Sequence, residues 1–114
     1  MKLIDVKIVE KPWGREIWFA SEKEYAGKIL ELRKGTRTSL HYHKRKRETM
    51  YVLDGRVIIY SEKNDEIRLE SGNAITINPG DRHRIYAEED TKILEVSTPE
   101  LNDVVRVEDD YGRD

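Results

Sequence analysis

Short apolar patches separated by turn-forming residues recur along the whole chain. The patches are rich in Ile, Val, Leu, Tyr and Thr, which favour the half-buried surface of a β-strand. No window carries an apolar stripe of useful length at the 3.6-residue period of a helix. The pattern therefore predicts strands at residues 7–9, 16–19, 28–33, 39–43, 49–53, 56–61, 66–70, 74–78, 84–87 and 92–97.

Turn signals lie between these segments. Asp54-Gly55 separates two of them and is a strong signal for a two-residue hairpin, and residues 63–65 and 71–73 mark further turns. Short strands at this spacing predict an all-β sandwich or barrel. The length of 114 residues fits one domain spanning residues 1–114.

The composition excludes several kinds of protein. The 21 basic and 23 acidic residues give a net charge of −2, so binding to nucleic acid or to an anionic membrane surface is not expected. No apolar run approaches the roughly 20 residues that a membrane span needs. The chain has no cysteine, which excludes disulfides, thiolate metal sites and a cysteine nucleophile.

The first residues of the chain and its density of charge bear on where the protein is found and in what kind of organism. Charged residues appear at Lys2 and Asp5, so no signal peptide is expected and the protein is predicted to be cytoplasmic. Glutamine is absent and charges of both signs are dense. This composition is typical of proteins from thermophiles.

The three histidines of the chain stand where they could meet a carboxylate. His41 and His43 are two residues apart, so on a strand their imidazoles share one face. Glu48 opens the next strand after a charged turn, and His83 follows the Pro79-Gly80 turn. Three imidazoles and a carboxylate suit a divalent first-row metal ion such as Zn, Mn, Fe or Ni. The alternative is that His41 and His43 are ordinary exposed strand residues.

The spacing of these residues resembles the first motif of the cupin family. That motif runs glycine, five residues, His-x-His, three or four residues, glutamate, six residues, glycine. Here Gly35, His41, His43, Glu48 and Gly55 occupy every fixed position.

The second cupin motif is matched with two departures. Gly72 is followed at the family's spacing by Pro79-Gly80 and then His83, while Asn78 replaces a proline and Ala87 replaces an asparagine. The resemblance implies a single cupin barrel, a double-stranded β-helix of jelly-roll type. It also implies that His41, His43, Glu48 and His83 are the metal ligands.

Two further segments resemble one branch of that family. Residues 9–14 with Glu16 are similar to its "RPWG" opening, and residues 102–113 are similar to its closing "DDIVRxEDxYGR". The branch is the C-terminal domain of type II mannose-6-phosphate isomerases, which also carry a guanylyltransferase domain. The resemblance covers about Val9 to Arg113 and implies a sugar-phosphate isomerase. Nucleotidyl transfer is not expected, because the guanylyltransferase domain is missing.

The chain departs from this branch at the proposed metal site. The isomerases usually have glutamine where this chain has His41, and His-Trp where it has Thr49-Met50. The three-His, one-Glu set is the general cupin set. Three functions therefore stay open: an isomerase or epimerase of a phosphorylated or nucleotide-linked sugar, an iron-dependent dioxygenase, and a non-catalytic, metal-stabilised sugar-binding module.

Basic residues near the ligands are candidates for binding an anionic sugar. Lys44, in the basic run 44–47, and Arg82, beside His83, are predicted to hold a phosphate. The alternative for the run is a solvated loop. Met50 and Tyr60 are further candidates for lining the pocket.

Other residues carry structural expectations. We expect Trp13 to close one end of the barrel and Tyr42 to face away from the metal. Residues 108–110 are expected to form a solvated, partly ordered tail. The strand at 56–61 is apolar on both faces, which predicts a homodimer burying either its outer face or the N-terminal strand.

Overall fold

The computed structural model describes residues 1–113, and within them every regular element is a β-strand. The ten strands predicted from the sequence all occur, and one further strand, β11, was missed. In the described part of the chain no helix is long and apolar enough to cross a membrane. The strands are β1 (Lys7–Lys11), β2 (Gly14–Ser21), β3 (Ala26–Leu32), β4 (Leu40–Tyr42), β5 (Glu48–Asp54), β6 (Arg56–Ser61), β7 (Glu66–Glu70), β8 (Ala74–Ile77), β9 (His83–Ala87), β10 (Thr91–Ser97) and β11 (Val105–Glu108).

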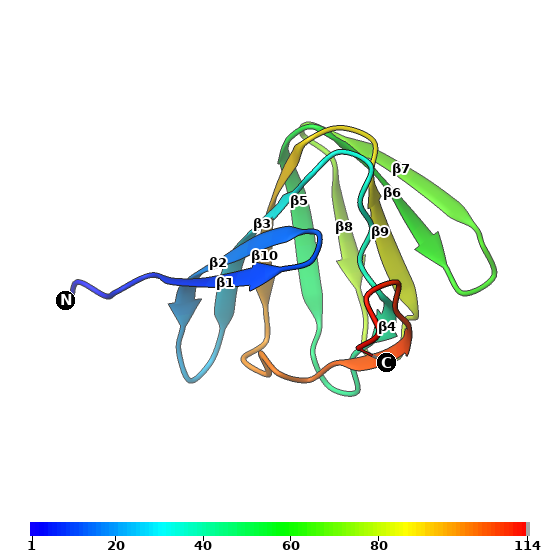
Figure 1. Cartoon of the computed structure of the whole chain (residues 1–114). Coiled ribbons are helices and arrows are strands. Elements are labelled where there is room, and N and C mark those ends of the chain that lie inside the picture. Colours follow the sequence, from blue (N-terminus) through cyan, green and yellow to red (C-terminus); the bar gives the residue numbers. More distant parts are fainter. Residues whose placement is uncertain (114) are drawn as a thin grey trace.

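The strands form two antiparallel sheets that face each other as a jelly-roll barrel (Figure 1). One sheet has the order β1-β2-β3-β10-β5-β8 and the other has the order β11-β4-β9-β6-β7. Neighbours such as β3, β10 and β5 are distant in sequence, as a jelly roll requires. The all-β, jelly-roll fold predicted from the sequence is confirmed.

The inside of the barrel is apolar at one end and polar at the other. Side chains alternate between the faces of a strand, so every second residue points inward. Along four strands the inward-facing residues are polar toward one end of the barrel and apolar toward the other. These pairs, polar residue first, are Glu48 and Val52 in β5, Lys28 and Leu32 in β3, Glu95 and Ile93 in β10, and His83 and Ala87 in β9. Each buried Val, Leu or Ile contributes about 1.5–3 kcal/mol. The apolar end therefore stabilises the barrel and leaves the other end available for chemistry.

The hairpin between β5 and β6 needs the glycine that the sequence places there. Gly55 has φ of 104°, a conformation that side chains with a Cβ rarely adopt. A Cβ at this position would lie 2.4 Å from Thr91 Oγ1 and 2.6 Å from the carbonyl oxygen of Asp90. Gly55 thus lets the hairpin pack closely on the start of β10.

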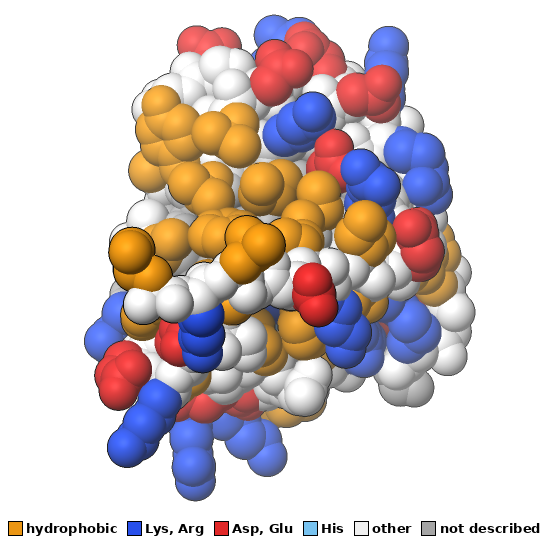
Figure 2. All heavy atoms as spheres, turned by 90° about the vertical axis from the view of Figure 1, so that its left-hand side faces the viewer, with side chains coloured by type: hydrophobic (Ala, Val, Ile, Leu, Met, Phe, Trp, Pro, Cys, Tyr) orange, Lys and Arg blue, Asp and Glu red, His pale blue; other side chains and the backbone are white. Residues whose placement is uncertain are grey.

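The outer face of the six-stranded sheet is apolar. Ile8, Tyr51, Leu53 and Val96 lie on strand positions opposite in parity to the inward residues, and each is between 43% and 53% exposed. Figure 2 shows apolar side chains gathered over this side of the molecule. The outer face of β6 differs, because Ile58 is buried. Of the two surfaces predicted for dimerisation, only the one that includes the N-terminal strand exposes apolar residues in quantity.

The C-terminal segment is more ordered than expected, although Glu108 and Asp110 are exposed as predicted. β11 pairs with β4, and Glu108 belongs to that strand although its side chain is exposed. Asp110 then accepts hydrogen bonds from Arg37 Nε, at 2.5 Å, and Nη2, at 2.8 Å. The segment is held because its carboxylates find specific donors on the barrel.

Acid should weaken the local structure of this C-terminal segment. The Arg113 guanidinium, hydrogen-bonded to Asp109, lowers the pKa of that carboxyl from 3.8 to about 2. A pKa below its unfolded value means that the pair stabilises the fold above about pH 4 and that this contribution is lost as the pH falls through about 2. The free energy of unfolding, measured from pH 5 to pH 2, should therefore fall less steeply for Asp109→Asn than for the wild type. Parallel curves would contradict the assignment.

Candidate metal centre

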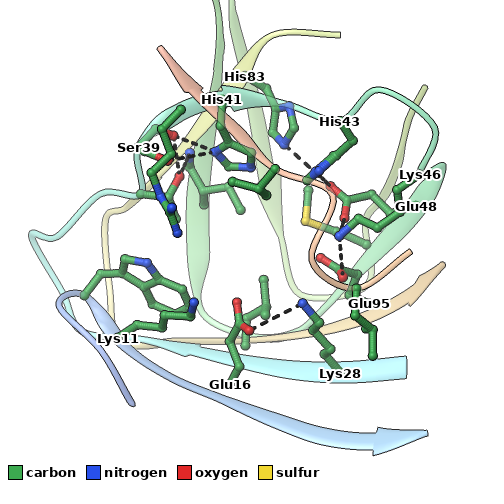
Figure 3. A pocket seen from close by; sticks show the side chains of 18 of the residues that line it. Lys11, Glu16, Lys28, Ser39, His41, His43, Lys46, Glu48, His83 and Glu95 are labelled. Atoms are coloured by element: carbon green, nitrogen blue, oxygen red, sulfur yellow. Dashed lines mark hydrogen bonds and ion pairs between the residues drawn. The ribbon is translucent and has the colours of Figure 1, made fainter. Parts of the chain in front are cut away.

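The polar end of the barrel brings the three histidines together (Figure 3). His41 in β4 and His83 in β9 are cross-strand partners, with ring centroids 4.4 Å apart. His43 follows β4, with its ring 5.2 Å from that of His41 and 5.7 Å from that of His83. One ring nitrogen of each histidine lies within 4.8 Å of the other two. The i, i+2 spacing thus places both imidazoles of the β4 region on one face, as predicted.

Glu48 reaches the same point from the facing sheet. It is the first residue of β5, and its Oε1 lies 3.4 Å from His43 Nε2 and 3.5 Å from His83 Nε2. Its side chain is buried. The structure therefore gathers all four residues that the sequence proposed as ligands.

The backbone orients each imidazole. The Nδ1 atoms are hydrogen-bonded to the carbonyl oxygens of Ser39 (2.8 Å), Asp103 (2.5 Å) and Asp81 (2.9 Å), for His41, His43 and His83 respectively. A carbonyl oxygen only accepts, so Nδ1 carries the proton and Nε2 keeps its lone pair. Metal-binding histidines commonly have this arrangement, because the second hydrogen bond fixes both tautomer and ring direction. His43 Nε2 is buried and has no hydrogen-bond partner among residues 1–113.

The charges of His41 and Glu48 also fit a cation. Burial, reinforced by the nearby His83, lowers the pKa of His41 to about 3, so this imidazole is neutral at ordinary pH. Burial alone would raise the pKa of Glu48, but the ammonium of Lys46, 3.0 Å from Oε2, lowers it and favours the carboxylate. Neutral imidazoles and an anionic carboxylate are the donors that a divalent first-row metal prefers. The residues present therefore fit such an ion.

A buried ion pair supports Glu48, and sequence reasoning missed it. Lys46 had been grouped with a basic rim, yet its side chain is only 3% exposed. Its Nζ lies 3.0 Å from Glu48 Oε2 and 3.5 Å from Glu95 Oε2. The available signal was Glu95 itself, an acidic residue at an inward position between the apolar residues Leu94 and Val96.

A cavity of about 250 Å³ opens beside the histidines. The wall opposite the imidazoles carries Lys11, Glu16 and Lys28 (Figure 3). Glu16 Oε1 accepts a hydrogen bond from Trp18 Nε1 at 2.9 Å and lies 3.4 Å from Lys28 Nζ. The cavity thus has the four clustered residues on one side and fixed polar groups on the other, as a polyhydroxylated ligand requires.

The two residues predicted to bind substrate lie outside this cavity. Lys44 is exposed and does not line it. Arg82 forms an ion pair with Glu62 at 3.0 Å and lies over the ring of Tyr42, 5.0 Å from its centroid. Both residues are next to a histidine in the sequence, which led to the prediction, but their side chains do not point into the cavity.

Of the positions predicted for the aromatic residues and Met50, that of Tyr60 differs from the structure. Trp13 is buried in the core, and its carbonyl oxygen accepts a hydrogen bond from the backbone N–H of Arg33, as an anchor should. Trp13 and Met50 both line the cavity. Tyr42 does not line it, as predicted, whereas Tyr60 lies away from it, against outer grooves of the barrel.

Several solved structures share this fold. KdgF from Halomonas sp. is 23% identical, with 88% of this chain and 90% of that one covered and a TM-score of 0.75. An RmlC-like cupin from Shewanella frigidimarina is 17% identical, with 86% and 87% covered and a TM-score of 0.76. Pac13, a nucleoside dehydratase whose Streptomyces protein has been solved with uridine, is 14% identical, with 91% and 86% covered and a TM-score of 0.78. At these identities the likeness concerns the fold alone.

The family is shown by a second comparison. The family model described as "Cupin domain" matches residues 28–97, more than half of the chain, and the matched stretch contains all four clustered residues. The comparison with curated proteins found no match. The finer resemblance to the C-terminal domain of mannose-6-phosphate isomerases stays a prediction. On the matched segment, the jelly-roll fold and the spacing of both motifs, the chain belongs to the cupin family.

Proposed function

We propose that the protein is a metal-dependent isomerase or epimerase that acts on a small anionic sugar. The observation that carries this proposal is the cluster formed by the three imidazoles and the Glu48 carboxylate, which reaches them from the facing sheet, beside a polar cavity. A divalent ion held there would polarise a sugar carbonyl and stabilise an enediolate. His41, His43, Glu48 and His83 would be its ligands.

The chain's own groups supply the rest of the chemistry. Glu16 faces the cavity from the wall opposite the imidazoles, fixed by Trp18 and Lys28. We assign the transfer of a proton between neighbouring carbons to Glu16, because burial, and then the charge of Glu48, raise the pKa of Glu95 to about 8 and keep that carboxyl protonated at neutral pH.

The most specific form of the proposal is a mannose-6-phosphate isomerase-like reaction. It draws support from the C-terminal segment, which resembles that of the isomerases and which contributes Val104, Arg106 and Arg113 to the cavity wall. Pac13, a neighbour in fold, acts on a nucleoside, so a barrel of this shape can hold a sugar-containing ligand.

The metal and the turnover can be tested together. Protein purified without added metal should contain Zn, Mn or Ni and should interconvert mannose 6-phosphate and fructose 6-phosphate, while His83→Ala should do neither. Iron with oxygen uptake would instead support a dioxygenase. Tight sugar binding without turnover under every metal would support a binding module and would contradict the isomerase.

We also infer that the protein is a homodimer formed through the outer face of the six-stranded sheet. An apolar surface of this kind on a small barrel marks an interaction site. A second copy suits it, because a regular sheet face can pair with itself about a two-fold axis. The N-terminal segment adds exposed Leu3 and Val6 next to β1, so the apolar surface continues beyond the barrel.

Sedimentation at micromolar concentration tests the dimer. The wild type should sediment at twice 13.5 kDa, and Tyr51→Lys combined with Val96→Lys should shift it to the monomer. Ile67→Lys, on exposed β7 of the other sheet, is a matched control that should remain dimeric. A wild type found only at 13.5 kDa would show the inference to be wrong.

A further inference from the structure

Five cationic side chains line the cavity, and three of them are neutralised by carboxylates. Lys28 pairs with Glu16, Lys46 pairs with Glu48 and Glu95, and Arg113 makes two hydrogen bonds to Asp109, at 2.9 and 3.0 Å. Lys11 and Arg106 line the same cavity. Within residues 1–113 neither of these two has an ion-pair or side-chain hydrogen-bond partner.

Arg106 is placed beside the histidine cluster by strand pairing. It lies in β11, where its Cα partner across the ladder is His41 of β4. Directly opposed residues of antiparallel strands project from the same face, about 4.5–5.5 Å apart at Cβ. Since both residues line the cavity, the guanidinium side chain lies on the cavity side of the sheet, next to His41.

Lys11 approaches from the other sheet. It is the last residue of β1, opposite Gly14, and its half-buried side chain lies on the wall that faces the imidazoles (Figure 3). Burial lowers the pKa of Lys11, as do the nearby charges of Lys28, Arg106 and Arg113, while Glu16 opposes them. Glu16 is already engaged by Lys28 and by Trp18. This part of the cavity therefore holds more positive charge than residues 1–113 neutralise.

We propose that Lys11 and Arg106 form an oxyanion subsite, which takes the carboxylate or phosphate of a small sugar acid or sugar phosphate. Arg106 supplies the planar fork that binds two oxygens at once, and Lys11 supplies a compact charge from the opposite wall. The sugar oxygens of such a ligand are then directed toward the histidine cluster. The identity of the ligand as a sugar rests on the proposed function, and the placement of its anion rests on these two residues. The subsite takes the role that sequence reasoning gave to Lys44 and Arg82.

The cavity contains its own reporter. The chain has two tryptophans, Trp13 and Trp18, and both line the cavity, so intrinsic fluorescence reports its occupancy. Fructose 6-phosphate, glucuronate and uncharged fructose are titrated into wild type, Lys11→Met, Arg106→Met and the control Lys34→Met, which removes an exposed cation from a turn. The same titrations with chelator-treated protein separate anion binding from the metal. Lys44→Met and Arg82→Met are titrated in parallel.

The subsite predicts that at least one anionic probe binds, and that fructose binds about tenfold or more weakly. Lys11→Met and Arg106→Met should each lose about tenfold in affinity for that probe, while Lys34→Met keeps it. Preference for fructose 6-phosphate identifies a phosphate subsite, and preference for glucuronate identifies a carboxylate subsite. If the losses persist in chelator-treated protein, the subsite stands even where metal-dependent turnover fails. Wild-type affinity in both variants, losses only in Lys44→Met or Arg82→Met, or no binding of either anion would overturn it.

Discussion

Lys46→Met should destabilise the metal-free protein by about 3–5 kcal/mol, the usual cost of removing one partner from a buried ion pair. Lys46 lies 3.0 Å from Glu48, and both side chains are 3% exposed. Burial, and then the charge of Glu48, raise the pKa of Glu95 to about 8, so Glu95 holds a proton at neutral pH. Lys46 is therefore the cation that compensates the Glu48 carboxylate, and methionine would leave that charge buried without a partner. Denaturant unfolding in the presence of a chelator measures the loss.

The neighbouring Lys44 provides the matched control. It has the same side chain two residues earlier, but it is exposed. Lys44→Met should therefore change the free energy of unfolding by less than about 0.5 kcal/mol. If the two substitutions change the free energy of unfolding equally, the buried Lys46–Glu48 pair does not stabilise the protein and the assignment is wrong.

His43→Ala should abolish the stabilisation of the protein by metal. Binding to the folded state alone adds about 2.7 kcal/mol when the free ion is at a hundred times its dissociation constant. His43 offers a buried Nε2 that has no hydrogen-bond partner in the described chain, so its loss removes a donor already directed into the site. Thermal unfolding across a metal titration should show a rising midpoint for the wild type and a constant one for His43→Ala. The wild-type shift should also shrink in acid, because protons compete for the imidazoles.

Tyr42→Ala is the control for this titration. Tyr42 lies next to His43 in sequence but does not line the cavity. The variant should keep the metal-dependent rise in midpoint, even though its own midpoint is lower. A rise in His43→Ala as large as in the wild type would contradict the assignment of His43 as a ligand.

The sequence predicted the parts of this protein that depend on local rules. Strand alternation was sufficient to place His41 and His43 on one face, and the Asp54-Gly55 hairpin follows from the backbone freedom of glycine. β11 was missed because its strand structure depends on pairing with β4, about sixty residues away in sequence. No local pattern reports a pairing of that range.

The substrate side of the site could not be read in the same way. Lys44, Lys46 and Arg82 all stand close to the ligands in sequence, yet only Lys46 enters the cavity. The direction of each side chain depends on how the chain turns, after β4 for the two lysines and before β9 for Arg82. In the turn after β4, the backbone N–H groups of residues 44–46 donate hydrogen bonds to the Asp103 carboxylate. Lys11 and Arg106 were missed because only the closed barrel brings β1 and β11 to one cavity.

The metal content of the purified protein tests the central claim most directly. Wild type and His43→Ala are prepared in parallel without added metal, and elemental analysis by mass spectrometry measures each first-row ion per chain. The structure predicts a divalent ion close to one per chain in the wild type and a large loss in His43→Ala. Equal metal content in the two proteins, or a wild type that neither contains nor takes up a divalent ion, would contradict the metal centre and the enzymatic proposal built on it.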